Sequence, residues 1–152
     1  MRPAMPLNSA WRGVSLDKQG GAGDRRGMFM NVVYVALGGA VGAALRYLTG
    51  IGVVRLLGRG FPMAIITVNI IGSFLMGAFV VLAAHRGLTH LSPLVMTGFL
   101  GGFTTFSAFS LEAVTLFERG QMGAAVAYVA ISLVGSIGGL MLGLLVARGM
   151  VA

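Results

Sequence analysis

The sequence predicts an all-α membrane protein with four transmembrane helices. Of its 152 residues, 57% are hydrophobic and only 10% are charged, whereas a soluble domain carries about 25% charged residues. The mean hydropathy is +0.91. Long apolar stretches occupy about 30–55, 61–85, 91–117 and 121–147, and each is long enough to cross a bilayer, which takes about 20 helical residues.

Residues 1–27 differ from the rest because they are polar and rich in glycine. No apolar run follows their early charges as it would in a secretory signal. We interpret 1–27 as a disordered leader, or as a start assigned too early, since Met28 and Met30 stand directly before the first apolar stretch. The predicted four-helix domain is 28–152.

The first apolar stretch combines many small residues with Arg46, which interrupts its apolar run. Gly and Ala let helix backbones approach closely, which favours helix association in lipid. Arg46 comes 17 residues after Phe29, so we expect it near the membrane edge. There it would reach the headgroups or attract anions into a vestibule.

In the second stretch, Asn69 and Ser73 lie one helical turn apart and share a face. Two interpretations stay open. The pair either makes one hydrogen bond to another helix or offers an amide and a hydroxyl to a passing ligand, because polar groups at membrane depth need a partner or a function.

The third stretch contains GGFTTFSAFS at 101–110. Gly101-Gly102 followed by Thr104-Thr105 is poor helix sequence, so we predict a broken helix whose freed carbonyls could hold a cation. Such backbone persists at membrane depth only when it is buried in protein or lines a cavity. Phe106 and Phe109 follow at i and i+3, and their positive ring edges could stabilise an anion; alternatively they only pack. Glu112, late in the stretch, is expected at the interface.

The fourth stretch places Tyr128, Ser132 and Ser136 at i, i+4 and i+8. A single Ser in such a helix usually bonds its own backbone. Three hydroxyls in register instead indicate a track of donors for a dehydrating anion.

Charge at the ends of the stretches bears on membrane topology. Short connections make neighbouring helices antiparallel. Counted from Met28, one side has two Lys or Arg and the other has three, whereas the leader changes this to seven against three. Orientation follows the bias of Lys and Arg between the two sides. A chain starting near Met28 would therefore insert in both orientations, and the leader would favour one.

Three segments and the hydroxyl stripe, in this order, resemble the Fluc-type fluoride channels, also called CrcB proteins, over about 28–148. The segments are GGAVGAALRY (38–47), VNIIGSFLMG (68–77) and GFLGGFTTFSAFSLE (98–112). The resemblance implies an antiparallel, dual-topology homodimer in the cell membrane, for passive fluoride efflux that protects the cell from fluoride. It also implies a structural sodium ion, held by backbone carbonyls at positions matching Gly101 and Thr104.

The resemblance further implies a set of side chains for the ion. Arg46 and Glu112 match two charged residues of the family. Ala108 departs from the family pattern, which has Thr there and so one more hydroxyl. The expected fluoride path comprises Asn69, Phe106, Ser107, Phe109, Ser110, Tyr128, Ser132 and Ser136.

Other functions are less well supported by the residues. A small multidrug-resistance-type exporter, the chief alternative, couples to protons through an acid in its first span, where this chain has Arg46 and no acid. A non-transporting membrane subunit would not need the polar stripe. With no Cys and two His in one loop, no nucleophile and base are paired as in an enzyme. The basic residues are scattered between apolar runs, which argues against nucleic acid and for contact with membrane lipid.

Overall fold

The structure is a computed structural model that describes residues 22–58 and 60–151. Within these residues the chain is helical, has no strand, and contains four segments long and apolar enough to span a membrane. The prediction of an all-α protein with four spanning helices is confirmed for this part of the chain. The segments are α2 (Ala22–Leu57), α3 (Met63–Arg86), a composite third span (Thr89–Glu118) and α6 (Met122–Val151).

The third span is not one regular helix. Thr104 and Thr105 have extended backbone, with φ/ψ of −82°/163° and −155°/121°. Gly101 and Gly102, where the predicted break begins, are helical instead. The elements of this span are η2 (Thr89–Leu91), the π-helix η3 (Pro93–Leu100), α4 (Gly101–Phe103) and α5 (Phe106–Glu118).

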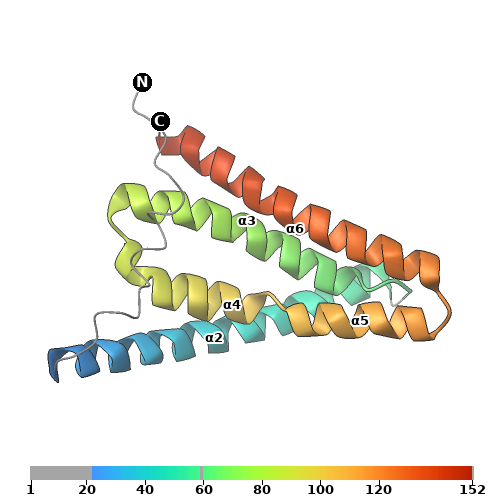
Figure 1. Cartoon of the computed structure of the whole chain (residues 1–152), viewed down its shortest axis with the longest axis horizontal. Helices are drawn as coiled ribbons and strands as arrows, with labels where there is room; N and C mark the ends of the chain where they lie inside the picture. The colour runs from blue at the N-terminus through green and yellow to red at the C-terminus, as the bar shows by residue number, and fades with distance from the viewer. Residues whose placement is uncertain (1–21, 59, 152) are drawn as a thin grey trace.

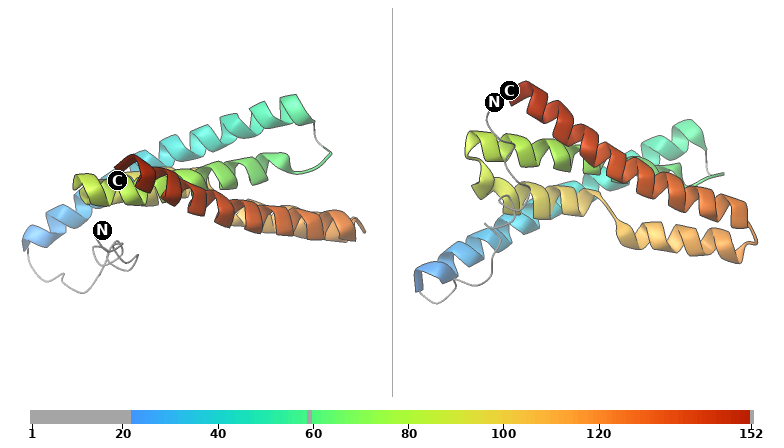
Figure 2. Two further views of the ribbon diagram at one scale, coloured as in Figure 1. Left: turned by 90° about the horizontal axis from the view of Figure 1, so that it is seen from above. Right: turned by 45° about the horizontal axis from the view of Figure 1, so that its top comes forward.

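The helices lie alongside one another in antiparallel order. In Figures 1 and 2, α3 and α6 run side by side, while α2 packs against η3 and α4. Figure 1 places the start of α2, the turn after α3 and the end of α6 at one end of the molecule. The end of α2 and the turn between α5 and α6 lie at the other end.

Glycines determine how closely these helices approach. A Cβ added to Gly143 of α6 would collide with the carbonyl oxygen of Phe74 in α3. A Cβ on Gly42 of α2 would collide with the carbonyl oxygen of Phe99 in η3. Backbones therefore touch directly at both crossings, as is typical of helices that associate in lipid.

Helix α2 begins at Ala22, so 22–27 are helical, although the sequence predicts a disordered leader up to residue 27. Extending an existing helix is much easier than nucleating one, and the apolar stretch after Met28 supplies the nucleus. The rest of the predicted leader, 1–21, lies outside the described residues.

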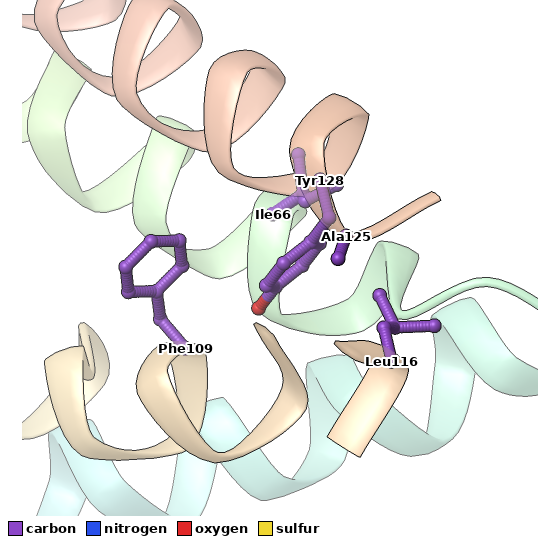
Figure 3. Close-up of a cluster of buried hydrophobic side chains, with 5 residues drawn as sticks. All are labelled: Ile66, Phe109, Leu116, Ala125 and Tyr128. Atoms are coloured by element: carbon purple, nitrogen blue, oxygen red, sulfur yellow. The ribbon is translucent and has the colours of Figure 1, made fainter. Parts of the chain in front are cut away.

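The core is small and lies between α3, α5 and α6 (Figure 3). Many large apolar side chains are exposed on the outer faces of the helices. Such a surface suits lipid or a second protein chain rather than water. The buried cluster comprises Ile66, Phe109, Leu116, Ala125 and Tyr128.

Candidate functional site

A groove of about 360 Å³ opens beside the extended Thr104–Thr105 segment. It brings together predicted site residues from three parts of the chain: Asn69 of α3, Phe106 and Phe109 of α5, and Ser132 and Ser136 of α6. Its other lining residues are Gly72, Ser73, Met76, Thr104, Thr105, Leu133, Ile137 and Leu140.

Asn69 binds the backbone of Thr105 through both ends of its amide. The Nδ2 group donates to the carbonyl oxygen of Thr105 at 3.1 Å, and the Thr105 N–H donates to Oδ1 at 2.8 Å. The hydrogen bond to another helical segment, one of the two interpretations open for Asn69, is therefore present. A side-chain amide has two N–H donors, so one can still face the groove that Asn69 lines.

Thr105 caps the helix that follows it. Its hydroxyl accepts from the Ala108 N–H at 3.2 Å and lies 3.3 Å from the hydroxyl of Ser107. The Thr105 residue is only 8% exposed. Thr105 is not among the predicted site residues, although a Thr directly before a helix is a strong capping signal.

Arg46, which the sequence predicts near the membrane edge, contacts the extended segment. Its guanidinium donates to the carbonyl oxygen of Thr104 at 3.3 Å, across 58 positions of the chain. In a continuous helix that oxygen would accept from the Ala108 N–H, which here bonds Thr105. The long side chain of Arg46 therefore reaches a carbonyl that has lost its helical donor.

The two phenylalanines differ in environment. Phe106 is 76% exposed, whereas Phe109 is 8% exposed. Their ring centroids are 5.5 Å apart at 40°, and Phe109 also stacks on Tyr128 at 5.4 Å. Phe109 therefore packs in the core as well as bordering the groove, and Phe106 is free to meet a ligand or another chain.

The hydroxyl stripe of α6 is largely buried and partly unpartnered. Tyr128 is 0% exposed and Ser132 is 4% exposed, and neither hydroxyl has a hydrogen-bond partner among the described residues. Figure 3 shows the Tyr128 hydroxyl pointing from α6 towards α5. Because buried polar groups are nearly always hydrogen-bonded, two unpartnered hydroxyls one turn apart mark this part of α6 as a candidate binding surface.

The remaining predicted side chains do not line the groove. Ser110 donates to the Phe106 carbonyl of its own helix at 3.0 Å. Ser107 is exposed and pairs with the Thr105 hydroxyl. Glu112 is half-buried on α5. Tyr128 is also absent from the lining, so the groove contains five of the eight residues of the expected fluoride path.

Two backbone carbonyls at or just before the extended segment lack their helical donors. In a continuous helix the Thr105 N–H would donate to the Gly101 carbonyl, but it bonds Asn69 instead. Similarly, the Ala108 N–H would donate to the Thr104 carbonyl in a continuous helix, but here it donates to the Thr105 hydroxyl. Carbonyl oxygens replace the hydration shell of alkali cations in membrane proteins. The Gly101 carbonyl could serve as such a ligand, and so could the Thr104 carbonyl through the lone pair that Arg46 does not use.

Comparisons with known proteins agree with the resemblance in the sequence. The family model described as "CrcB-like protein, Camphor Resistance (CrcB)" matches residues 33–144. A protein of Ruegeria sp. (strain TM1040) named "Fluoride-specific ion channel FluC" is 67% identical over 123 residues, covering 80% of this chain and 98% of that one. Proteins of the same name from Cereibacter sphaeroides (strain ATCC 17029 / ATH 2.4.9) and Agrobacterium fabrum (strain C58 / ATCC 33970) are 56% and 47% identical, covering 82% and 80% of this chain and 100% and 98% of their own. The chain belongs to the CrcB family.

Proposed function

We propose that this chain forms a fluoride-specific ion channel, which lets fluoride leave the cell passively and so protects it from fluoride toxicity. Its relatives carry the name of such a channel. The observation that carries the proposal is the groove, which is lined by an amide residue, two serines and two phenylalanines: Asn69, Ser132, Ser136, Phe106 and Phe109.

The chemistry of the groove suits a small, strongly hydrated anion. Amide and hydroxyl donors can replace water around fluoride, while ring edges add a weak positive potential. A conducting site must bind well enough to admit the ion and weakly enough to release it. The lining residues, all within the described ranges, include no carboxylate, so no proton-coupling acid of the exporter type borders the groove.

A second, antiparallel copy of the chain would complete the pathway. The groove opens at the molecular surface, and Phe106 at its edge is 76% exposed. Many other large apolar residues are exposed as well, which is typical of a surface that meets another chain or lipid. We therefore assign the functional form to an antiparallel, dual-topology homodimer in the cell membrane.

A structural sodium ion would be held by the carbonyls of Gly101 and Thr104, contributed by both copies. The ion would supply positive charge near the extended segments and tie the two copies together. We expect the dimer to dissociate more readily when sodium is replaced by N-methylglucamine, as measured by size-exclusion chromatography in detergent. A dimer equally stable in both salts would contradict the assignment.

The deciding experiment is anion efflux from liposomes that contain the purified protein. We expect fluoride efflux, read with a fluoride electrode, and no chloride efflux under the same conditions. Equal flux of both ions, or none, would overturn the proposal.

A variant pair tests the groove within the same assay. Phe106→Ala should abolish fluoride efflux without preventing dimer formation. Leu111→Ala, which changes another exposed apolar residue of the same helix, should conduct like the unmodified protein. Normal conduction by Phe106→Ala would place the ion path elsewhere.

A further inference from the structure

The backbone of the extended segment is satisfied entirely by its own chain. Thr104 donates its N–H to the Leu100 carbonyl at 2.9 Å, and its carbonyl accepts from Arg46. Thr105 exchanges both of its backbone bonds with Asn69. Unsatisfied backbone groups at membrane depth cost several kcal/mol each, so these side chains decide whether the segment can leave the helix.

Asn69 matters most among these contacts because of which helical bond it replaces. The Thr105 N–H can donate either to the Gly101 carbonyl, as in a continuous helix, or to Oδ1 of Asn69. The 2.8 Å distance to Oδ1 shows that the second bond is made. The Nδ2 group donates to the Thr105 carbonyl at the same time. One amide can bond both groups of Thr105 only when its N–H and C=O point to the same side, as they do in extended backbone.

From this geometry we infer that Asn69 is a positioning residue: its amide holds Thr105 out of the helix and thereby frees the Gly101 carbonyl. The effect on Gly101 as a cation ligand rests on the proposed function. The effect on Thr105 does not, because all of these bonds form within one protomer. Asn69 therefore acts on the ion path through the backbone, in addition to any direct contact of its remaining N–H with an anion.

The sequence offers a specific spectroscopic probe of this peptide bond. Thr104-Thr105 is the only Thr-Thr pair in the chain. When only threonine carries both ¹³C and ¹⁵N, an NMR experiment that links an amide to the preceding carbonyl gives one signal, from the Thr104 carbonyl and the Thr105 amide. That signal is recorded in detergent micelles without fluoride.

We expect Asn69→Ala to shift this signal and to make the Thr105 amide exchange with D₂O about tenfold faster, the factor that one typical hydrogen bond provides. Ser73→Ala is the matched control, because Ser73 lies one turn further along α3 and lines the same groove. It should leave the signal in place. An unchanged signal and exchange rate in Asn69→Ala would overturn the inference.

Asn69→Asp keeps the test decisive if the alanine variant does not fold. A protonated carboxyl can accept from the Thr105 N–H and donate to the Thr105 carbonyl, as the amide does, whereas a carboxylate can only accept. The signal should match that of the unmodified protein at low pH and move away as the carboxyl ionises. A signal that does not change as this carboxyl ionises would count against the inference. Because the spectra are recorded without fluoride, this outcome does not depend on the result of the liposome assay.

Discussion

Tyr128 and Ser132 place two hydroxyls in the interior without a hydrogen-bond partner among the described residues. A buried hydroxyl left unsatisfied costs about 1–3 kcal/mol. Natural proteins retain such strained or unsatisfied groups mainly at functional sites, where activity opposes stability. We therefore expect the two hydroxyls to lower the stability of the protein and to contribute to the proposed ion path.

Tyr128→Phe should raise the unfolding temperature by a few degrees, because it removes about 1 kcal/mol or more of unsatisfied polarity. The same change should slow fluoride efflux, since one donor of the stripe is lost. Circular dichroism during heating and the liposome assay measure the two effects. Tyr47→Phe, at a residue that is 70% exposed, should change neither. A lower unfolding temperature in Tyr128→Phe would mean that the hydroxyl has a partner.

At the residue scale, polarity alone selects side chains that the structure brings together. Asn69, Ser132 and Ser136 stand out in apolar stretches, and the structure places them in one groove. Their partners could not be predicted, because Asn69 and Thr105 are 36 positions apart and meet only after α3 packs against the third span. The acceptor of Arg46 could not be predicted for the same reason, since it lies 58 positions away.

At the scale of helices, the third span shows the limit of propensity arguments. Gly101 and Gly102 are weak helix formers, yet both are helical. Gly102 is used for packing, because a Cβ there would lie 2.7 Å from the Gly39 carbonyl oxygen in α2. The extended residues are the threonines that follow, for which side-chain partners exist. Tertiary contacts therefore determined where the helix ends, and sequence alone could not supply them.

The crossing of α3 and α6 provides a prediction at this scale. Gly143→Ala should lower the unfolding temperature by about 5 °C, because the added methyl would meet the Phe74 carbonyl and overpacking costs about 1–3 kcal/mol. Gly138→Ala on the same helix is the control. It has open space around it and should be neutral or slightly stabilising, since Ala favours helix over Gly. Equal effects of the two changes would contradict the proposed crossing.

At the scale of the whole molecule, basic residues gather at the two ends of the helical bundle. The start of α2, with Arg25 and Arg26, lies at the same end as the turn after Arg86 and the end of α6 at Arg148 (Figure 1). Arg119 follows α5 at the other end. Because short, basic ends orient a membrane protein, the residues before Met28 bear directly on how the chain inserts.

The full chain should favour one orientation, and a chain that starts at Met28 should insert almost equally in both. The chain has no Cys, so Gln121→Cys supplies a single label between α5 and α6. Its reaction with a membrane-impermeant maleimide, in intact and in permeabilised cells, gives the fraction in each orientation. For the full chain carrying Arg25→Gln and Arg26→Gln, the fraction in the favoured orientation should lie between the values for the full chain and for the chain that starts at Met28. The same orientation in all three would show that these charges do not direct insertion.

The order of residues along the chain also gives the extended segment a biosynthetic advantage. Both side chains that bond Thr104 and Thr105 come earlier in the sequence, Arg46 in α2 and Asn69 in α3. Synthesis proceeds from the N-terminus, so the first two spans are made before the third leaves the ribosome. Partners for the unwound peptide groups are thus already present when it enters the bilayer, and the nascent third span need not wait for a second copy to shield its backbone from lipid.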